Sequence, residues 1–127
     1  MVLPKVIWVG IGGSIGAIMR YLVSGAVYSW FQKPVFPAGT LAVNIIGCLI
    51  IGLLGGLAET RHVFSPEMRT LVFIGFLGSF TTFSSFGYEV FQLMRDGQMA
   101  LALSNALLHL IVGLIAVWLG IVVARVI

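Results

Sequence analysis

Charged side chains are scarce in this sequence. Asp, Glu, Lys and Arg make up 9% of its 127 residues, whereas a soluble domain carries about 25%. Hydrophobic residues reach 60%, so the chain has too little polar surface for water, and its natural solvent is lipid. The formal charge of +3 is spread between apolar runs, with no patch that would follow a phosphate backbone. We therefore expect no nucleic-acid partner.

Cysteine is equally scarce, with a single residue, Cys48, inside an apolar stretch. One thiol excludes a disulfide framework and a cysteine-based metal site, and we interpret Cys48 as a small buried core residue. The first apolar segment lacks the A-x-A cleavage pattern of a signal peptide, so we expect a retained first helix. The residues form no nucleophile–base–acid set, metal-ligand cluster or phosphate loop, so we expect no enzyme.

Long apolar runs, in contrast, are abundant. Four of them reach the roughly 20 residues that cross a bilayer core of about 30 Å as a helix. They predict an all-α membrane protein with a single transmembrane domain over residues 1–127. The predicted spans are about 6–28, 38–58, 69–94 and 99–124. Gly12 and Gly16 in the first span, and Gly52 and Gly56 in the second, form GxxxG steps that predict close helix packing.

The basic residues are almost balanced between the two sides of the membrane. Four spans place both chain ends on one side, and the basic residues on that side are Lys5, Arg61, Arg69 and Arg125. The other side has Lys33, Arg95 and, if it reaches the end of its helix, Arg20. Such a small bias is either a weak orientation signal or a sign of dual topology. We favour dual topology, with antiparallel pairing of two copies, because one bundle of four helices encloses a polar path poorly.

Polar side chains inside the spans are costly in lipid and therefore informative about function. Arg20, in the last third of the first span, either snorkels to the water interface or forms an electropositive entry for anions. Asn44, in the second span, is either hydrogen-bonding glue between helices or a pore amide that replaces a water around an anion. Thr40 lies four residues earlier and therefore on the same helix face as Asn44.

The middle of the third span, residues 75–87, reads GFLGSFTTFSSFG. Ser and Thr compete with the helical backbone for hydrogen bonds, and glycine weakens a helix. We therefore predict a helix break at mid-membrane, where irregular backbone is tolerated only inside protein or beside a wet cavity. Free carbonyls there would suit a cation, whereas hydroxyls and the positive edges of Phe rings would suit an anion. The alternative is a continuous helix whose hydroxyls bond back to the preceding turn.

Two titratable residues lie within the last two spans. Glu89 falls about a turn and a half before the end of the third span, and His109 lies near the middle of the fourth. Either is a candidate proton site. We expect Glu89 to reach the headgroup region, and His109 to be a packing residue held by hydrogen bonds.

Three segments resemble the small bacterial fluoride channels, the Fluc or CrcB family. They are GGSIGAIMR at residues 12–20, GTLAVN at 39–44 and GSFTTFSSF at 78–86. The order and length of all four spans match as well, so the resemblance covers nearly the whole chain. It implies a fluoride-selective channel for passive fluoride export across the bacterial inner membrane. It also implies an antiparallel, dual-topology homodimer in lipid, with two pores and a third helix broken at mid-membrane.

The resemblance also implies a role for particular residues. A structural sodium ion on the two-fold axis would be held by the main-chain carbonyls of Gly78 and Thr81. Phe83 and Phe86 would face fluoride with their ring edges. The remaining pore residues implied by the resemblance are Asn44, the polar positions Thr40, Thr82 and Ser85, and Arg20 near a helix end. Some members carry small hydroxyl residues along the fourth helix, where this chain has Asn105 and His109, and these two are candidates for that polar role.

Two other functions remain as alternatives. A small multidrug exporter also has four helices and dual topology, but it needs a membrane-embedded carboxylate, and the first span has none. Glu89 is the only acidic residue well inside any predicted span. A non-transporting assembly subunit would instead tolerate changes at Asn44, Phe83 and Phe86 without loss of ion flux.

Overall fold

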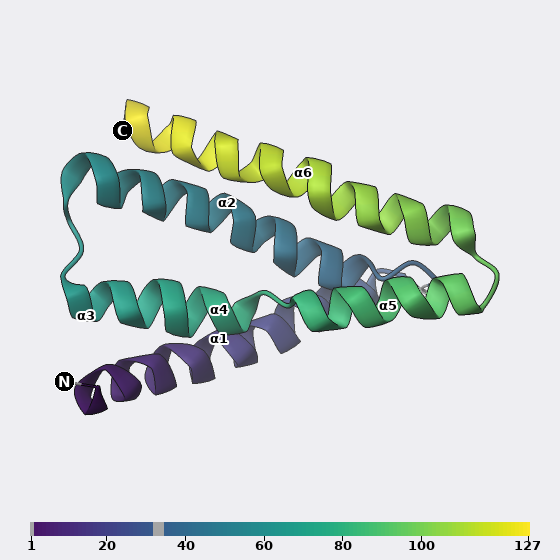
Figure 1. Cartoon of the computed structure of the whole chain (residues 1–127), viewed down its shortest axis with the longest axis horizontal. Helices are drawn as coiled ribbons and strands as arrows, with labels where there is room; N and C mark the ends of the chain where they lie inside the picture. Colours follow the sequence, from purple (N-terminus) through teal and green to yellow (C-terminus); the bar gives the residue numbers. More distant parts are fainter. Residues whose placement is uncertain (1, 32–34) are drawn as a thin grey trace.

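The computed structural model describes residues 2–31 and 35–127, and its regular structure there is entirely helical (Figure 1). Lys33, counted in the charge balance above, lies outside the described residues. The helices are α1 (Leu3–Ser29), α2 (Ala38–Arg61), α3 (Pro66–Arg69), η1 (Thr70–Leu77), α4 (Gly78–Phe80), α5 (Phe83–Arg95) and α6 (Met99–Val126).

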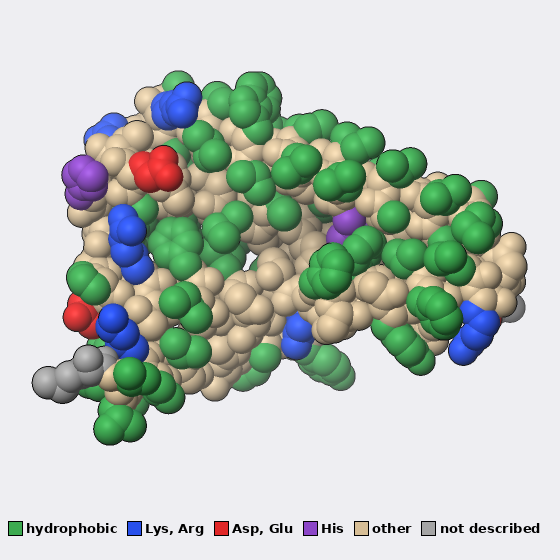
Figure 2. All heavy atoms as spheres, viewed as in Figure 1, with side chains coloured by type: hydrophobic (Ala, Val, Ile, Leu, Met, Phe, Trp, Pro, Cys, Tyr) green, Lys and Arg blue, Asp and Glu red, His purple; other side chains and the backbone are tan. Residues whose placement is uncertain are grey.

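Four helical stretches are long and apolar enough to cross a membrane, as the hydropathy pattern predicts. They are Leu3–Ser29, Ala38–Arg61, Pro66–Arg95 and Met99–Val126, each a few residues longer than the apolar run that predicted it. The chain ends lie at the same end of the molecule (Figure 1). Hydrophobic side chains are spread along the face shown in Figure 2, and charged side chains gather mainly at its ends. The surface therefore suits lipid along its length and water at its ends.

The pair α2 and α6 packs through glycines whose neighbours are backbone atoms. A Cβ added at Gly52 would meet the backbone of Val117, and one added at Gly120 would meet the backbone of Leu49 and Leu53. Lipid offers helices no hydrophobic drive to associate, so such close backbone approach supplies the packing energy instead. The GxxxG step of the second span therefore packs as predicted.

The pair α1 and η1 also packs through glycines that lie against the backbone of the facing helix. A Cβ at Gly12 would meet the backbone of Leu71, and a Cβ at Gly16 would meet the backbone of Phe76. From the other side, a Cβ at Gly75 would lie 2.9 Å from the Val9 carbonyl oxygen. Across this contact the third span runs as wide π-type turns over Thr70–Leu77, a geometry that is rare in proteins and frequent near functional sites.

Candidate functional site

The third span is interrupted at Thr81 and Thr82, midway along Pro66–Arg95. Thr81 and Thr82 both have extended backbones, with φ/ψ of −91°/162° and −153°/117°. A new helix, α5, begins at Phe83 with Thr82 as its N-cap, because the Thr82 hydroxyl accepts a hydrogen bond from the Ser85 N–H at 3.2 Å. The structure thus interrupts the helix inside the Gly/Ser/Thr/Phe run where the sequence predicts a break.

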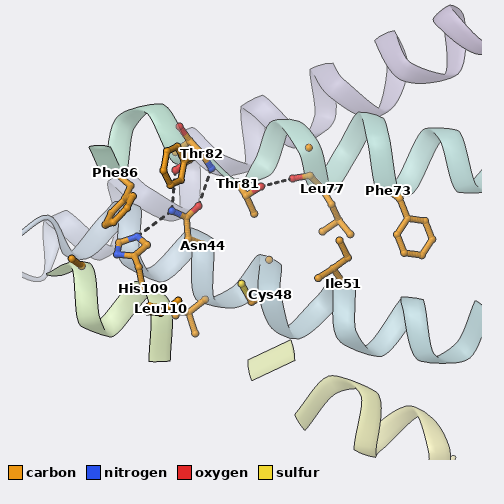
Figure 3. Close-up of a pocket in the computed structure, with 15 residues that line it drawn as sticks. Asn44, Cys48, Ile51, Phe73, Leu77, Thr81, Thr82, Phe86, His109 and Leu110 are labelled. Carbon is orange, nitrogen blue, oxygen red and sulfur yellow. Dashed lines mark hydrogen bonds between the residues drawn. The ribbon is translucent and has the colours of Figure 1, made fainter. Parts of the chain in front are cut away.

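Asn44 on α2 holds the interrupted backbone in place. Its Oδ1 accepts from the Thr82 N–H at 2.8 Å, and its Nδ2 donates to the Thr82 carbonyl at 3.0 Å (Figure 3). One amide side chain therefore satisfies both main-chain polar groups of a residue that has left the helix. A buried backbone group without a partner costs roughly 1–3 kcal/mol, so this pair of bonds is what makes the interruption tolerable.

The two carbonyls expected to hold sodium lose their helical donors at the same place. In a continuous helix the carbonyl of Gly78 would accept from the Thr82 N–H, and that of Thr81 from the Ser85 N–H. Here Asn44 takes the first N–H and the Thr82 hydroxyl takes the second. The freed oxygens are of the kind that binds a hard cation, so Gly78 and Thr81 fit the group that the resemblance assigns to them.

His109 on α6 completes the cluster around Asn44. Its Nε2 lies 3.1 Å from Asn44 Nδ2, and its Nδ1 lies 3.0 Å from the Asn105 carbonyl oxygen. The imidazole also lies against Phe86, with ring centroids 4.1 Å apart, and Phe86 in turn contacts Phe83 at 5.5 Å. Figure 3 shows the side chains of Asn44, Phe86 and His109 turned toward one another beside the interrupted backbone. His109 is thus held by hydrogen bonds, as expected.

A cavity of about 480 Å³ opens beside this cluster (Figure 3). Its polar lining comes from Asn44, His109 and the interrupted segment, and most of the remainder is apolar. Phe83 and Phe86 form one wall, and Gly78 and Thr81 also line the cavity. The described residues of the lining combine an amide, hydroxyls and Phe rings and include no Asp, Glu, Lys or Arg, and such neutral groups suit an anion.

A second cavity, of about 820 Å³, lies on the other side of Thr82. Its polar lining includes Arg20 from α1, Thr40 from α2, and Thr82, Ser85 and Glu89 from the third span, together with Tyr21, Ser24 and Tyr28 of α1. Thr82 lines both cavities. The interrupted residue therefore stands between a neutral aromatic cavity and a polar one that carries an arginine.

Comparison with known proteins identifies the family. The family model described as CrcB-like protein, Camphor Resistance (CrcB), matches residues 7–121. The chain belongs to the CrcB family. Relatives named "Fluoride-specific ion channel FluC" include those of Methylobacillus flagellatus, 45% identical over 91% of each chain, and Magnetococcus marinus, 45% identical over 97% of this chain and 99% of the other. That of Geotalea daltonii is 46% identical over 97% and 98%. CrcB relatives of this name are ion channels and not enzymes.

The site residues implied by resemblance to the CrcB family fall into two groups around the interruption. Asn44, Phe83 and Phe86 line the smaller cavity, whereas the larger one collects Arg20, Thr40 and Ser85. The structure brings each group together, and Thr82 joins them. What this arrangement does for an ion stays a prediction.

Two residues of this CrcB chain make contacts that the sequence did not indicate. Glu89 accepts a hydrogen bond from the Thr40 hydroxyl at 2.5 Å, because α2 passes beside α5 at this point, and its position at the headgroups stays a prediction. Asn105, a candidate pore residue, is fully buried (0% exposed), and neither side-chain polar atom has a partner among the described residues. Its backbone carbonyl, rather than its side chain, contacts His109. In the sequence, the only feature that relates to the Glu89 contact is the position of Thr40 on the same helix face as Asn44.

Proposed function

We propose that this chain is a fluoride-selective channel that exports fluoride passively across the bacterial inner membrane. One observation carries the proposal. The Asn44 amide is hydrogen-bonded to the interrupted backbone of the third span, and it lines a cavity together with Phe83 and Phe86. Family membership supports it, because the relatives above are named fluoride-specific ion channels. We place the interruption at mid-membrane, since it lies midway along a helix long enough to span a bilayer.

Neutral donors suit the conduction of fluoride. The ion is small and holds its water tightly, so a selective pore has to replace that water with close hydrogen-bond donors. A ring of arginines would bind the ion too strongly for release, and conduction requires entry without trapping. The hydroxyls of Thr40, Thr82 and Ser85, the Asn44 amide and the edges of the two Phe rings each supply a modest contact. Arg20, beside the larger cavity, raises the local anion concentration.

The channel is proposed to be an antiparallel, dual-topology homodimer with two pores. Phe83 is 82% exposed in the single chain, although it belongs to the pore cluster, and Gly78 is exposed as well. The cavity beside Asn44 is open to the outside of the single chain, and the proposed second copy would cover it. Both chain ends lie at one end of the molecule, so the near balance of basic residues between its two ends leaves insertion free in either direction.

A sodium ion on the two-fold axis is the proposed structural ion. The carbonyls of Gly78 and Thr81 would hold it, together with the same carbonyls of the second copy. The ion would supply positive charge between two interrupted helices without placing a charged side chain in either pore. The loss of both helical donors, to Asn44 and to the Thr82 hydroxyl, supports this assignment.

Ion efflux from liposomes tests the function directly. Purified protein is reconstituted with fluoride or chloride inside, and release is followed with ion-selective electrodes. We expect rapid fluoride release with chloride retained, and loss of that release in Phe83→Ile and Phe86→Ile. Phe91→Ile, on the same helix but outside both cavities, is the matched control and keeps wild-type flux. Absence of fluoride release from dimeric protein would contradict the proposal and turn attention to a proton-coupled carrier that uses Glu89.

Labelling from one side of the membrane tests dual topology. Ser65 is exposed and is the N-cap of α3, which lies at the end of the molecule that carries both chain ends (Figure 1). In a Cys48→Ala background, Ser65→Cys is treated in intact cells with a thiol reagent that does not cross the inner membrane. Dual topology predicts that about half of the copies react. Labelling of all copies or of none would show a single orientation.

A further inference from the structure

The Asn44 amide has its orientation fixed by the backbone of Thr82. The Thr82 N–H can only donate, so the atom 2.8 Å from it is the amide oxygen; the Thr82 carbonyl can only accept, so the atom 3.0 Å from it is the amide nitrogen. One hydrogen of Nδ2 is used by the carbonyl. The other is directed at His109 Nε2, 3.1 Å away.

This orientation determines which nitrogen of His109 carries the proton. Nε2 faces a donor and has to accept, whereas Nδ1 faces the Asn105 carbonyl at 3.0 Å and has to donate. The neutral imidazole protonated at Nδ1 satisfies both contacts. The other neutral tautomer fails at both, and the doubly protonated ring turns an N–H toward the Asn44 NH₂ group.

We propose that His109, as the neutral Nδ1–H tautomer, is a positioning residue that locks the Asn44 amide onto the interrupted backbone, and that a proton on Nε2 releases this lock. The inference rests on the proposed function, because the amide that His109 positions holds the interrupted backbone of the proposed pore. The same imidazole lies against Phe86. A ring that turns away from Asn44 therefore also removes the support of a pore phenylalanine.

The lock lies among few other ionisable groups. Those that line the two cavities are Cys48 of α2 in the smaller one and, in the larger one, Glu89 of α5 with Arg20, Tyr21 and Tyr28 of α1. An imidazole, a carboxyl group and a thiol can each contribute to a pH profile. Removal of the imidazole alone therefore separates its contribution to a pH profile from the other two.

The first test observes the tautomer without any ion flux. The protein is labelled with ¹⁵N at histidine, reconstituted in bilayers, and the imidazole resonances are recorded by NMR from about pH 8 down to about pH 5. His62, the other histidine, is exposed in a loop, and the His62→Gln variant assigns its signals. We expect His109 to be protonated at Nδ1 alone at the high end of the range. Protonation at Nε2 alone would overturn the proposal.

The second test compares two replacements of His109 in the efflux assay, after subtraction of hydrogen fluoride leak through protein-free liposomes. His109→Gln keeps an amide oxygen that accepts from Asn44, and His109→Leu has similar bulk without an acceptor. We expect wild-type flux to fall roughly two- to tenfold as His109 protonates, the size of one net hydrogen bond. The Gln variant keeps the flux measured at high pH and lacks this fall. The Leu variant is reduced by a similar factor at every pH, and His62→Gln behaves as wild type.

The outcomes separate this inference from the proposed function. If the wild-type protein conducts no fluoride, the function fails, while the NMR measurement still decides the tautomer. If it conducts, but His109→Leu and wild type have the same flux and the same pH profile, the positioning role is wrong. Should both variants fail to fold, a wild-type flux that stays constant while the NMR signal of His109 titrates would contradict the lock equally well.

Discussion

The third span begins a helix twice, and the two beginnings are built differently. At Pro66 the helix starts with Ser65 as N-cap, whose hydroxyl accepts from the Met68 N–H at 3.2 Å. At Phe83 it starts again with Thr82 as N-cap, whose hydroxyl accepts from the Ser85 N–H at the same distance. The local chemistry is the same in both, a hydroxyl that satisfies an orphan backbone donor.

The difference lies in what surrounds each cap. Ser65 is exposed, and α3, which it caps, lies at the end of the molecule (Figure 1), so water serves its remaining backbone groups. Thr82 lies midway along the span, and Asn44 of another helix has to serve both of its backbone groups. A helix that starts inside a membrane protein therefore needs a hydrogen-bonding partner from elsewhere in the chain. Here that partner, Asn44, also lines the candidate functional site.

The largest effect on stability and on fluoride efflux is expected from removal of the Asn44 amide. Asn44→Leu leaves the Thr82 N–H and carbonyl without hydrogen bonds in a half-buried place, which costs about 1–3 kcal/mol of stability. Fluoride efflux should be lost with it. Thermal unfolding in detergent and efflux from liposomes measure the two effects. Asn44→Asp sharpens the comparison, because it keeps the acceptor for the Thr82 N–H and loses the donor. We expect it to recover part of the stability and none of the flux.

A smaller effect on the same two quantities is expected at Thr82, the N-cap of α5, which we call the inner cap. Thr82→Ala removes the hydroxyl that caps α5 and leaves the two backbone bonds to Asn44 in place, so stability should fall by about 1 kcal/mol. Thr82 also lines both cavities, so fluoride efflux should fall as well. Thr82→Ser keeps the cap and is the matched control for both measurements. Unchanged efflux in the Ala variant would show that the cap is structural only.

The sequence predicts the four spans well because the length and hydropathy of a span are local properties. Its window for the interruption, residues 75–87, is correct, but local propensity does not single out Thr82 within a run of Ser, Thr and Phe. Asn44, 38 residues away, makes that choice. A contact between two helices decides the position, and propensity alone carries no information about it.

Other features also depend on contacts between spans. The wide turns of Thr70–Leu77 lie against Gly12 and Gly16 of α1, and a hydropathy pattern cannot indicate them. Glu89 accepts a hydrogen bond from Thr40 of α2. The pairing of His109 with Asn44 follows from the parallel course of α2 and α6, in which Cys48 likewise lies beside Gly113. In each case the sequence supplies a polar residue or a glycine, and the fold supplies its partner.

The smallest effect is expected at Ser65, the N-cap of α3, which we call the outer cap. Substitutions there test the comparison between the two helix starts most directly. Ser65→Ala removes the same kind of hydrogen bond as Thr82→Ala, so it should lower stability by about 0.5–1 kcal/mol. Because Ser65 lines neither cavity, fluoride efflux per amount of folded protein should equal that of wild type. Ser65→Asp, which keeps an N-cap acceptor, should restore stability. If Ser65→Ala reduced efflux as much as Thr82→Ala does, conduction would follow helix stability in general, and the inner cap would have no special role.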